Sequence, residues 1–182
     1  MNTFRSEVEA INQSIAAFNQ HLAESYQIRE IDTTTGMKAK NIVEILHGRW
    51  DDFQFPNSDS RGVYFVFGRH REQQATNGVY IGKASFRSSI GRRLYSWLHP
   101  HRSSEHFIMN YGQETYILDY IASINLDTLA MPFMASALEE YLISSLSGRL
   151  NLLNGTGNSG RAEQVETQQP PLAALSAESP VI

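Results

Sequence analysis

Two tyrosines, a pair of arginines and a glutamate are side chains of types that could act together on a phosphate ester. Tyr64 and Tyr80 each lie in a short run of glycine, β-branched and aromatic residues, Arg92-Arg93 follow, and Glu139 comes later in an apolar segment. Cleavage of a phosphodiester needs an attacking water, a group that neutralises charge on the phosphate, and help for the departing oxygen. An arginine fork binds phosphate oxygens, and one carboxylate can hold a hard divalent cation that keeps its own waters.

A tyrosine that accepts a proton needs an explanation, because its free pKa is about 10. Lys83 closely follows Tyr80, and Arg93 lies on the next predicted helix. Positive charge favours the ionised phenol. We therefore expect Lys83, Arg93 and a metal-bound water network to lower the pKa of the tyrosine or to relay its proton.

Composition places both tyrosines on strands and the arginines on a helix. Arg61 to Phe67 and Val79 to Lys83 are rich in β-branched and aromatic residues, which predicts two strands. The polar residues 68–78 between them predict a long hairpin loop. Ser88 or Ser89 is a suitable N-cap for a helix that ends near Leu98.

Glu139 falls on a later predicted helix. Thr115 to Ile121 has the composition of a third strand, the pattern from Pro132 to Leu146 is helical, and Leu150 to Leu153 is a short extended piece. The elements together predict a mixed α/β (α+β) fold, with a small three-stranded antiparallel sheet flanked by helices.

The N-terminal segment adds helical structure before this domain. Residues 4–25 carry apolar side chains every three or four positions, which predicts an amphipathic helix. Its apolar stripe packs either on the domain body or on a second copy of the chain, which would make a homodimer. Tyr26 to Ile31 favours a short strand, and Lys38 to Leu46 favours a second short helix.

Three units follow along the chain. We expect an N-terminal helical extension over residues 1–60, the main domain over residues 61–158, and a disordered tail over residues 159–182, which has no aromatic residue. The chain has no cysteine, no apolar run long enough for a membrane span, and a polar N-terminus unlike a signal peptide. These features predict a soluble cytoplasmic protein without a membrane partner.

The net charge of −4 conceals a basic island, which we define as residues 61–106. This segment holds eight Lys or Arg against two acidic residues, and four of the six histidines. Such a concentration of positive charge is typical of a phosphate-binding surface. We expect DNA contacts from Arg61, Arg87, Arg92 and Arg102.

Residues 61–155 resemble the GIY-YIG nuclease domain. Gly62-Val63-Tyr64 matches its first signature and Tyr80-Ile81-Gly82 its second, in the element order strand, strand, helix, strand, helix. Within that superfamily the resemblance is strongest to the nuclease module of bacterial excision-repair nucleases. There, too, a Leu-Glu-x-x-Leu-Ile segment, here starting at Leu138, stands before an asparagine, here Asn151.

The resemblance implies a metal-dependent endonuclease that hydrolyses DNA, duplex or branched. It implies that Tyr80 is the stronger candidate for the general base, that Tyr64 orients the water or is itself the base, and that Arg93 stabilises the phosphate. Glu139 is implied as the ligand of Mg²⁺ or Mn²⁺. Supporting roles are implied for Lys83, Asn151 and Gly82, the last by letting phosphate approach the backbone.

Several alternatives remain open at this level. The segment from Tyr80 to Arg93 is two residues longer than in the excision-repair pattern, and Trp97 stands where a tyrosine is usual. Glu140 competes with Glu139, and Asn154 competes with Asn151. The scaffold is also compatible with a catalytically inactive nucleic-acid-binding module, or with a scaffold protein that binds a partner through the basic island.

Overall fold

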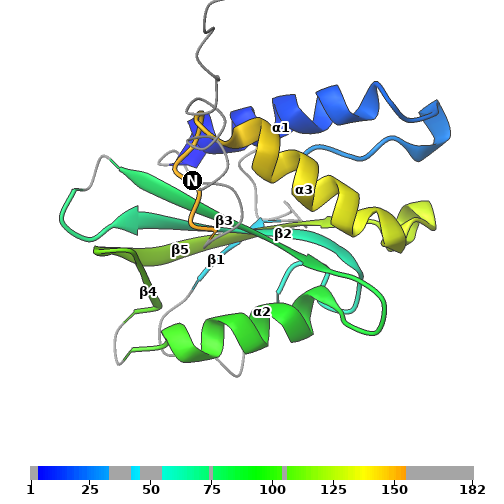
Figure 1. Cartoon of the computed structure of the whole chain (residues 1–182). Coiled ribbons are helices and arrows are strands. Elements are labelled where there is room, and N and C mark those ends of the chain that lie inside the picture. The colour runs from blue at the N-terminus through cyan, green and yellow to red at the C-terminus, as the bar shows by residue number, and fades with distance from the viewer. Residues whose placement is uncertain (1–3, 33–41, 46–54, 74–75, 104–105, 155–182) are drawn as a thin grey trace, which may run out of the picture.

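A five-stranded antiparallel sheet lies at the centre of the fold, with helices on both faces (Figure 1). The computed structural model describes residues 4–32, 42–45, 55–73, 76–103 and 106–154. The strands are β1 (Ile42–Glu44), β2 (Gly62–His70), β3 (Asn77–Ala84), β4 (Ile108–Tyr111) and β5 (Glu114–Asn125). The helices are α1 (Arg5–Asn19), α2 (Ile90–Leu98) and α3 (Ala135–Leu146), with short 3₁₀ turns η2 (Glu24–Tyr26), η4 (His99–His101), η5 (Asp127–Leu129) and η6 (Pro132–Met134).

The long strand β5 organises the sheet, whose order is β1-β5-β2-β3. One edge of β5 pairs with β2, and its other edge pairs with β4 near residues 114–117 and with β1 near residues 120–122. The outer edge of β3 is covered by the chain after α3, because Val79 exchanges backbone hydrogen bonds with Asn151 and Leu153. The mixed α+β class is therefore confirmed, with five strands where the sequence predicts three.

Two of these strands, β1 and β4, were not predicted from the sequence: β1 pairs with residues 120–122 of β5, far along the chain, whereas β4 is joined to the start of β5 by residues 112–113. The prediction of a helix over Lys38–Leu46 is wrong at residues 42–44, which pair with β5 as β1; residues 38–41 and 46 lie outside the described residues. β4 has no strong strand pattern of its own. Context of this kind regularly outweighs local preference in short strands.

The hairpin of β2 and β3 is longer than predicted. Both strands extend into the polar segment predicted as a loop, and paired residues reach Arg69 and Asn77. The polar side chains there find partners on β5, since Arg69 forms an ion pair with Asp119 and the ring of His70 packs against that of Tyr116.

The strand predicted over Tyr26–Ile31 is absent, because those residues bond to side chains of α1 instead of to another strand. The side-chain amide of Asn12 both donates to and accepts from the backbone of Ile31, and Asn19 does the same at Ile28. A carboxamide offers the same donor and acceptor pair as a peptide group. The predicted disordered tail, residues 159–182, lies outside the described residues.

The helices cover the sheet as two layers (Figure 1). On one face α1 and α3 pack together over β2 and β3, and Phe4 at the start of α1 contacts Phe67 and Tyr120. The apolar stripe of the N-terminal helix is thus buried on the domain body. In the described ranges, none of the helices has the length and apolar character to cross a membrane.

The other face carries α2, which the sequence predicts almost residue for residue. Ser89 is its N-cap and accepts a hydrogen bond from the backbone of Arg92. Ile90, Leu94 and Leu98 are fully buried against the sheet. Because these residues fix the rotation of the helix, Arg92 and Arg93 remain exposed beside the strand that carries Tyr80.

Candidate active site

Tyr64 on β2 and Tyr80 on β3 lie on the face of the sheet that α2 covers, with ring centroids 6.3 Å apart. Tyr64 is paired in register with Gly82. A Cβ atom at Gly82 would lie 2.4 Å from Cζ and 2.5 Å from Oη of Tyr64. Gly82 is thus required for the position of the Tyr64 ring. The ring fills the space beside Gly82 through which we expected a phosphate to approach the backbone.

The two tyrosines act on each other: Tyr80 raises the pKa of Tyr64, and the hydrogen bond with Tyr64 lowers the pKa of Tyr80. Burial is the main cause that raises the pKa of Tyr64, with further increases from Tyr80 and Glu139 that Arg93 opposes. Tyr64 is almost fully buried. Its hydroxyl therefore stays protonated and serves as a donor.

The pKa of Tyr80 is also raised, first by burial and then by Glu139. Arg93 lowers this pKa, as expected of a nearby cation, but does not outweigh these two causes. The hydrogen bonds from Tyr64 and Trp97 also act downward. Of the two tyrosines, Tyr80 is thus the one held by donors that favour its ionised form.

Trp97 takes part in the site in a way the sequence did not reveal. Its ring stacks on that of Tyr80 with centroids 4.4 Å apart, and it also hydrogen-bonds to the tyrosine. The ring of His101 also packs against Trp97, with ring centroids 4.7 Å apart. Burial lowers the pKa of His101. The tryptophan therefore supplies a donor that lowers the pKa of Tyr80.

Glu139 approaches the tyrosines from α3, on the opposite face of the sheet. Its Oε2 lies 2.7 Å from Nζ of Lys83, and its side chain is only 16% exposed. Glu140 is exposed. Glu139 nevertheless raises the pKa of both Tyr64 and Tyr80. The site straddles β3, with Glu139 and Lys83 on one side and Arg93 on the other.

A divalent cation at this site would have one protein carboxylate. No group of three or more His, Asp or Glu residues capable of enclosing a metal occurs in the part of the chain that the structure describes. A single carboxylate is compatible with Mg²⁺ or Mn²⁺ where water and substrate phosphate complete the coordination. Glu139 fits that role once its oxygen is released by Lys83.

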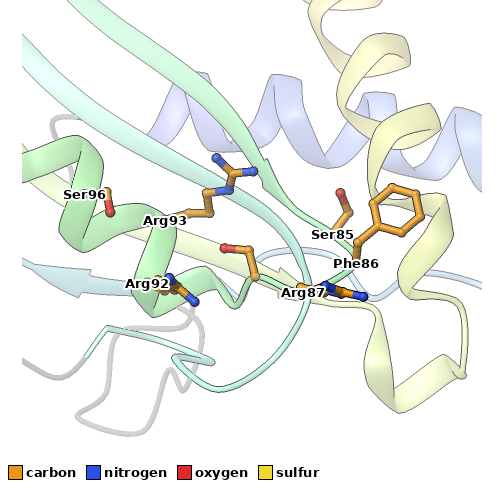
Figure 2. Close-up of a pocket in the computed structure, with 7 residues that line it drawn as sticks. Ser85, Phe86, Arg87, Arg92, Arg93 and Ser96 are labelled. Carbon is orange, nitrogen blue, oxygen red and sulfur yellow. The ribbon is translucent and has the colours of Figure 1, made fainter.

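Arg93 lies at the mouth of an open pocket between α2 and the loop that precedes it. The pocket is lined by Ser85, Phe86, Arg87, Ser88, Arg92, Arg93 and Ser96. Figure 2 shows that the side chains of Arg92 and Arg93 leave the helix in different directions, with Arg93 extended beside the strands. Arg93 is also the arginine whose charge acts on both tyrosines.

The structure separates the two candidate asparagines. Asn154 lies beside the second tyrosine: its Oδ1 accepts from the backbone N–H of Ile81 at 3.1 Å, and its Nδ2 donates to the Ile81 carbonyl at 2.6 Å. Asn151 lies near the other end of β3, where Nδ2 donates to Oη of Tyr116 at 2.8 Å. Both asparagines therefore contact β3: Asn154 through its side chain at Ile81, and Asn151 through its backbone carbonyl at Val79 and its side chain at Asn77.

The predicted DNA-contacting arginines fall into two groups. Arg87 and Arg92 line the pocket with Arg93, and Arg102 is exposed after η4. Arg61 is held by Asp127, whose carboxylate accepts from both its backbone N–H and its guanidinium, with an ion pair at 2.7 Å. Arg61 thus fixes the turn after β5 rather than projecting freely from the basic island.

We compared the chain with protein-family models, with curated proteins and with solved structures, and none of these comparisons gave a match. What the protein does is therefore inferred from the residues and geometry above.

Proposed function

We propose that this protein is a metal-dependent endonuclease of the GIY-YIG type that hydrolyses DNA phosphodiester bonds. The observation that carries the proposal is the gathering of Tyr64, Tyr80, Arg93 and Glu139 around the second half of β3, from four separate elements. Two observations support this grouping: the rings of Tyr64 and Tyr80 lie 6.3 Å apart, and Arg93 and Glu139 both act on the pKa of these tyrosines. Perturbed titratable groups clustered beside an open pocket are typical of active sites.

Arg93 is suited to neutralise the phosphate. Its guanidinium is exposed at the pocket and offers several donors in a planar fork, which matches two oxygens of one phosphate. Hydrolysis builds negative charge on those oxygens. A fixed cation there lowers the barrier more than it strengthens ground-state binding.

Tyr80 is suited to accept the proton of the attacking water. Tyr64 and Trp97 both direct hydrogen bonds to it and so stabilise a negative charge on its oxygen. Tyr64 remains protonated because it is buried, so it keeps the donor role throughout. The two tyrosines therefore have different roles. Tyr80 accepts the proton of the attacking water, and Tyr64 orients Tyr80.

Glu139 is suited to hold the cation. A bound Mg²⁺ or Mn²⁺ would polarise a phosphate oxygen and acidify a coordinated water. Neutralising the charge of Glu139 would also remove one of the causes that raise the pKa of Tyr80. Before a cation binds, the ion pair with Lys83 holds the Glu139 carboxylate at the end of β3.

Lys83 and a cation would compete for the carboxylate of Glu139. This competition favours a second candidate function, that of a nucleic-acid-binding module without activity. If the Lys83 ion pair at 2.7 Å persists in the presence of substrate, no carboxylate is available for a cation. The same scaffold and arginines would then bind DNA without cutting it.

Cleavage of supercoiled, linear and branched DNA with Mg²⁺ or Mn²⁺, and with EDTA as the blank, tests the proposal. We expect nicked or linear products from the wild-type protein in metal only. Glu139→Ala should abolish cleavage and retain DNA binding, since it removes the metal ligand and also a negative charge that repels phosphate. Glu140→Ala, a matched change at an exposed neighbour, should cleave normally.

Binding without cleavage by the wild-type protein would favour the inactive module. Wild-type cleavage by Glu139→Ala would contradict the assignment of the metal ligand.

A further inference from the structure

Phe86 has an unusual position for a large apolar side chain. It is 81% exposed, more than any other large hydrophobic residue among those the structure describes. Figure 2 shows its ring standing at the pocket that also contains Arg87, Arg92 and Arg93. Single exposed apolar residues are common, so exposure alone carries no conclusion.

The backbone at Phe86 adds a second observation. Its φ of 55° lies in the left-handed region, which bulky residues seldom adopt. Phe86 is the second residue of a turn closed by the hydrogen bond from Ser88 N to Ser85 O, a place where glycine, asparagine or aspartate is usual. With so little of its surface buried, the ring gains little packing within the fold to offset this conformation.

The surroundings indicate what such a ring would contact. Three arginines line the same pocket, and Tyr95, which is 52% exposed, lies on α2 beyond them. Exposed aromatic rings beside arginines form the surfaces on which unpaired bases stack while the cations bind the phosphates. A fully paired duplex offers its bases only at their edges, so it cannot use the face of the ring.

We propose that Phe86 stacks on an unpaired nucleobase next to the phosphate held by Arg93, so that the protein prefers DNA with a bulge, flap or branch over a continuous duplex. This inference rests on the proposed nuclease function and names its substrate class.

Binding to three short DNA duplexes tests the inference, with EDTA present to prevent cleavage. One duplex is fully paired, one carries a central single-nucleotide bulge of 2-aminopurine, and one carries an abasic bulge. We expect fluorescence anisotropy to show about tenfold tighter binding of the 2-aminopurine bulge than of the paired duplex, the scale of one base–aromatic stack. Binding should also quench the 2-aminopurine fluorescence, and the abasic bulge should bind like the paired duplex.

Phe86→Asn is the informative variant because asparagine tolerates the left-handed conformation. It should keep or raise the melting temperature, bind the paired duplex as before, and lose both the preference and the quenching. Phe86→Tyr should retain both. Tyr26→Ala, at an exposed aromatic residue of η2, should behave as wild type.

Two results would overturn the inference in distinguishable ways. A Phe86→Asn variant that keeps the preference and the quenching would remove the stacking role and leave the nuclease proposal intact. If the wild-type protein binds none of the three duplexes at low ionic strength and cleaves no DNA, the proposed function fails and this inference fails with it.

Discussion

Arg92 and Arg93 are adjacent in the sequence, but we propose different roles for them. The difference comes from the geometry of the helix. Consecutive helical residues point about 100° apart. The buried residues Ile90, Leu94 and Leu98 set the rotation of α2, and Arg93 is then the arginine whose charge reaches the two tyrosines. Arg92 remains on the exposed side of the pocket.

We therefore expect Arg93→Ala to lower the cleavage rate by about 10²-fold or more, because it removes charge stabilisation in the transition state. Arg92→Ala should mainly weaken binding and reduce the slope of log K against log salt by about one unit, as for one lost phosphate contact. Single-turnover rates and binding isotherms at several salt concentrations measure both effects. Identical behaviour of the two variants would show that α2 presents a different face to DNA.

The tyrosine pair makes a sharper prediction. Tyr80→Phe keeps the ring stacked on Trp97 and removes only the hydroxyl, so we expect cleavage to fall by about 10²-fold or more, the scale of a lost general base. Tyr64→Phe should reduce the rate less, because it removes one of two hydrogen bonds to Tyr80. Single-turnover rates with melting temperatures for each variant separate chemistry from folding. Normal cleavage by Tyr80→Phe would leave Tyr80 with a packing role only.

At the scale of elements, the sequence predicted those helices and strands whose secondary structure is determined by their own residues. The helix of residues 90–98 has its own cap and apolar stripe, and the strands that carry Tyr64 and Tyr80 have their own β-rich composition. β1 and β4 depend on β5, and the segment at Ile28–Ile31 depends on side-chain amides of α1. For β1 and for the segment at Ile28–Ile31, no local pattern in the sequence records the partner; β4 pairs with the residues of β5 that follow it directly, and its short hairpin was overlooked.

The candidate site, too, was predictable from the sequence only in part. Tyr64, Tyr80, Arg93 and Glu139 were expected from the resemblance, and the structure places them on β2, β3, α2 and α3. Their electrostatics did not follow, because burial dominates the pKa of both tyrosines and burial is a tertiary property. The choice between Asn151 and Asn154 stayed open in the sequence, since it depends on how the chain after α3 passes along β3.

Asn154 offers a prediction at this scale. Asn154→Ala removes both hydrogen bonds to Ile81, so we expect a loss of about 1–3 kcal/mol in the free energy of unfolding and a lower cleavage rate, since the strand at Tyr80 loses its lateral support. Asn151→Ala should destabilise through the lost Tyr116 contact and leave the rate per folded molecule nearly unchanged. Urea denaturation together with rates on folded protein compares the two. An equal effect of both variants on the rate would remove the special position of Asn154.

At the scale of the whole molecule, the N-terminal segment belongs to the same core as the sheet. Val8, Ile11 and Ile15 of α1 are fully buried in one cluster with Phe65 and with Leu138 of α3, the helix that carries Glu139. The packing of α1 therefore contributes to the position of the carboxylate on the far side of β3. The site depends on both layers of helices, and its buried hydroxyls depend on the stability of the whole fold.

The burial of Tyr64 makes that dependence measurable at alkaline pH. An unfolded tyrosine ionises near pH 10, whereas burial raises the pKa of Tyr64 in the folded state. Above about pH 10 the unfolded chain therefore loses this proton first, and the free energy of unfolding falls by up to about 1.4 kcal/mol per pH unit from this group. Below pH 9 the same group contributes no pH dependence.

We expect the melting temperature of the wild-type protein to fall more steeply between pH 9 and pH 11 than that of Tyr64→Phe, which has no hydroxyl to ionise. Tyr26→Phe, a change at an exposed ring, should follow the wild-type curve. Thermal unfolding followed by circular dichroism across this range makes the comparison. If Tyr64→Phe and the wild-type protein lose stability in parallel, the Tyr64 hydroxyl ionises as readily in the folded state as in the unfolded one, and the donor role assigned to it would be wrong.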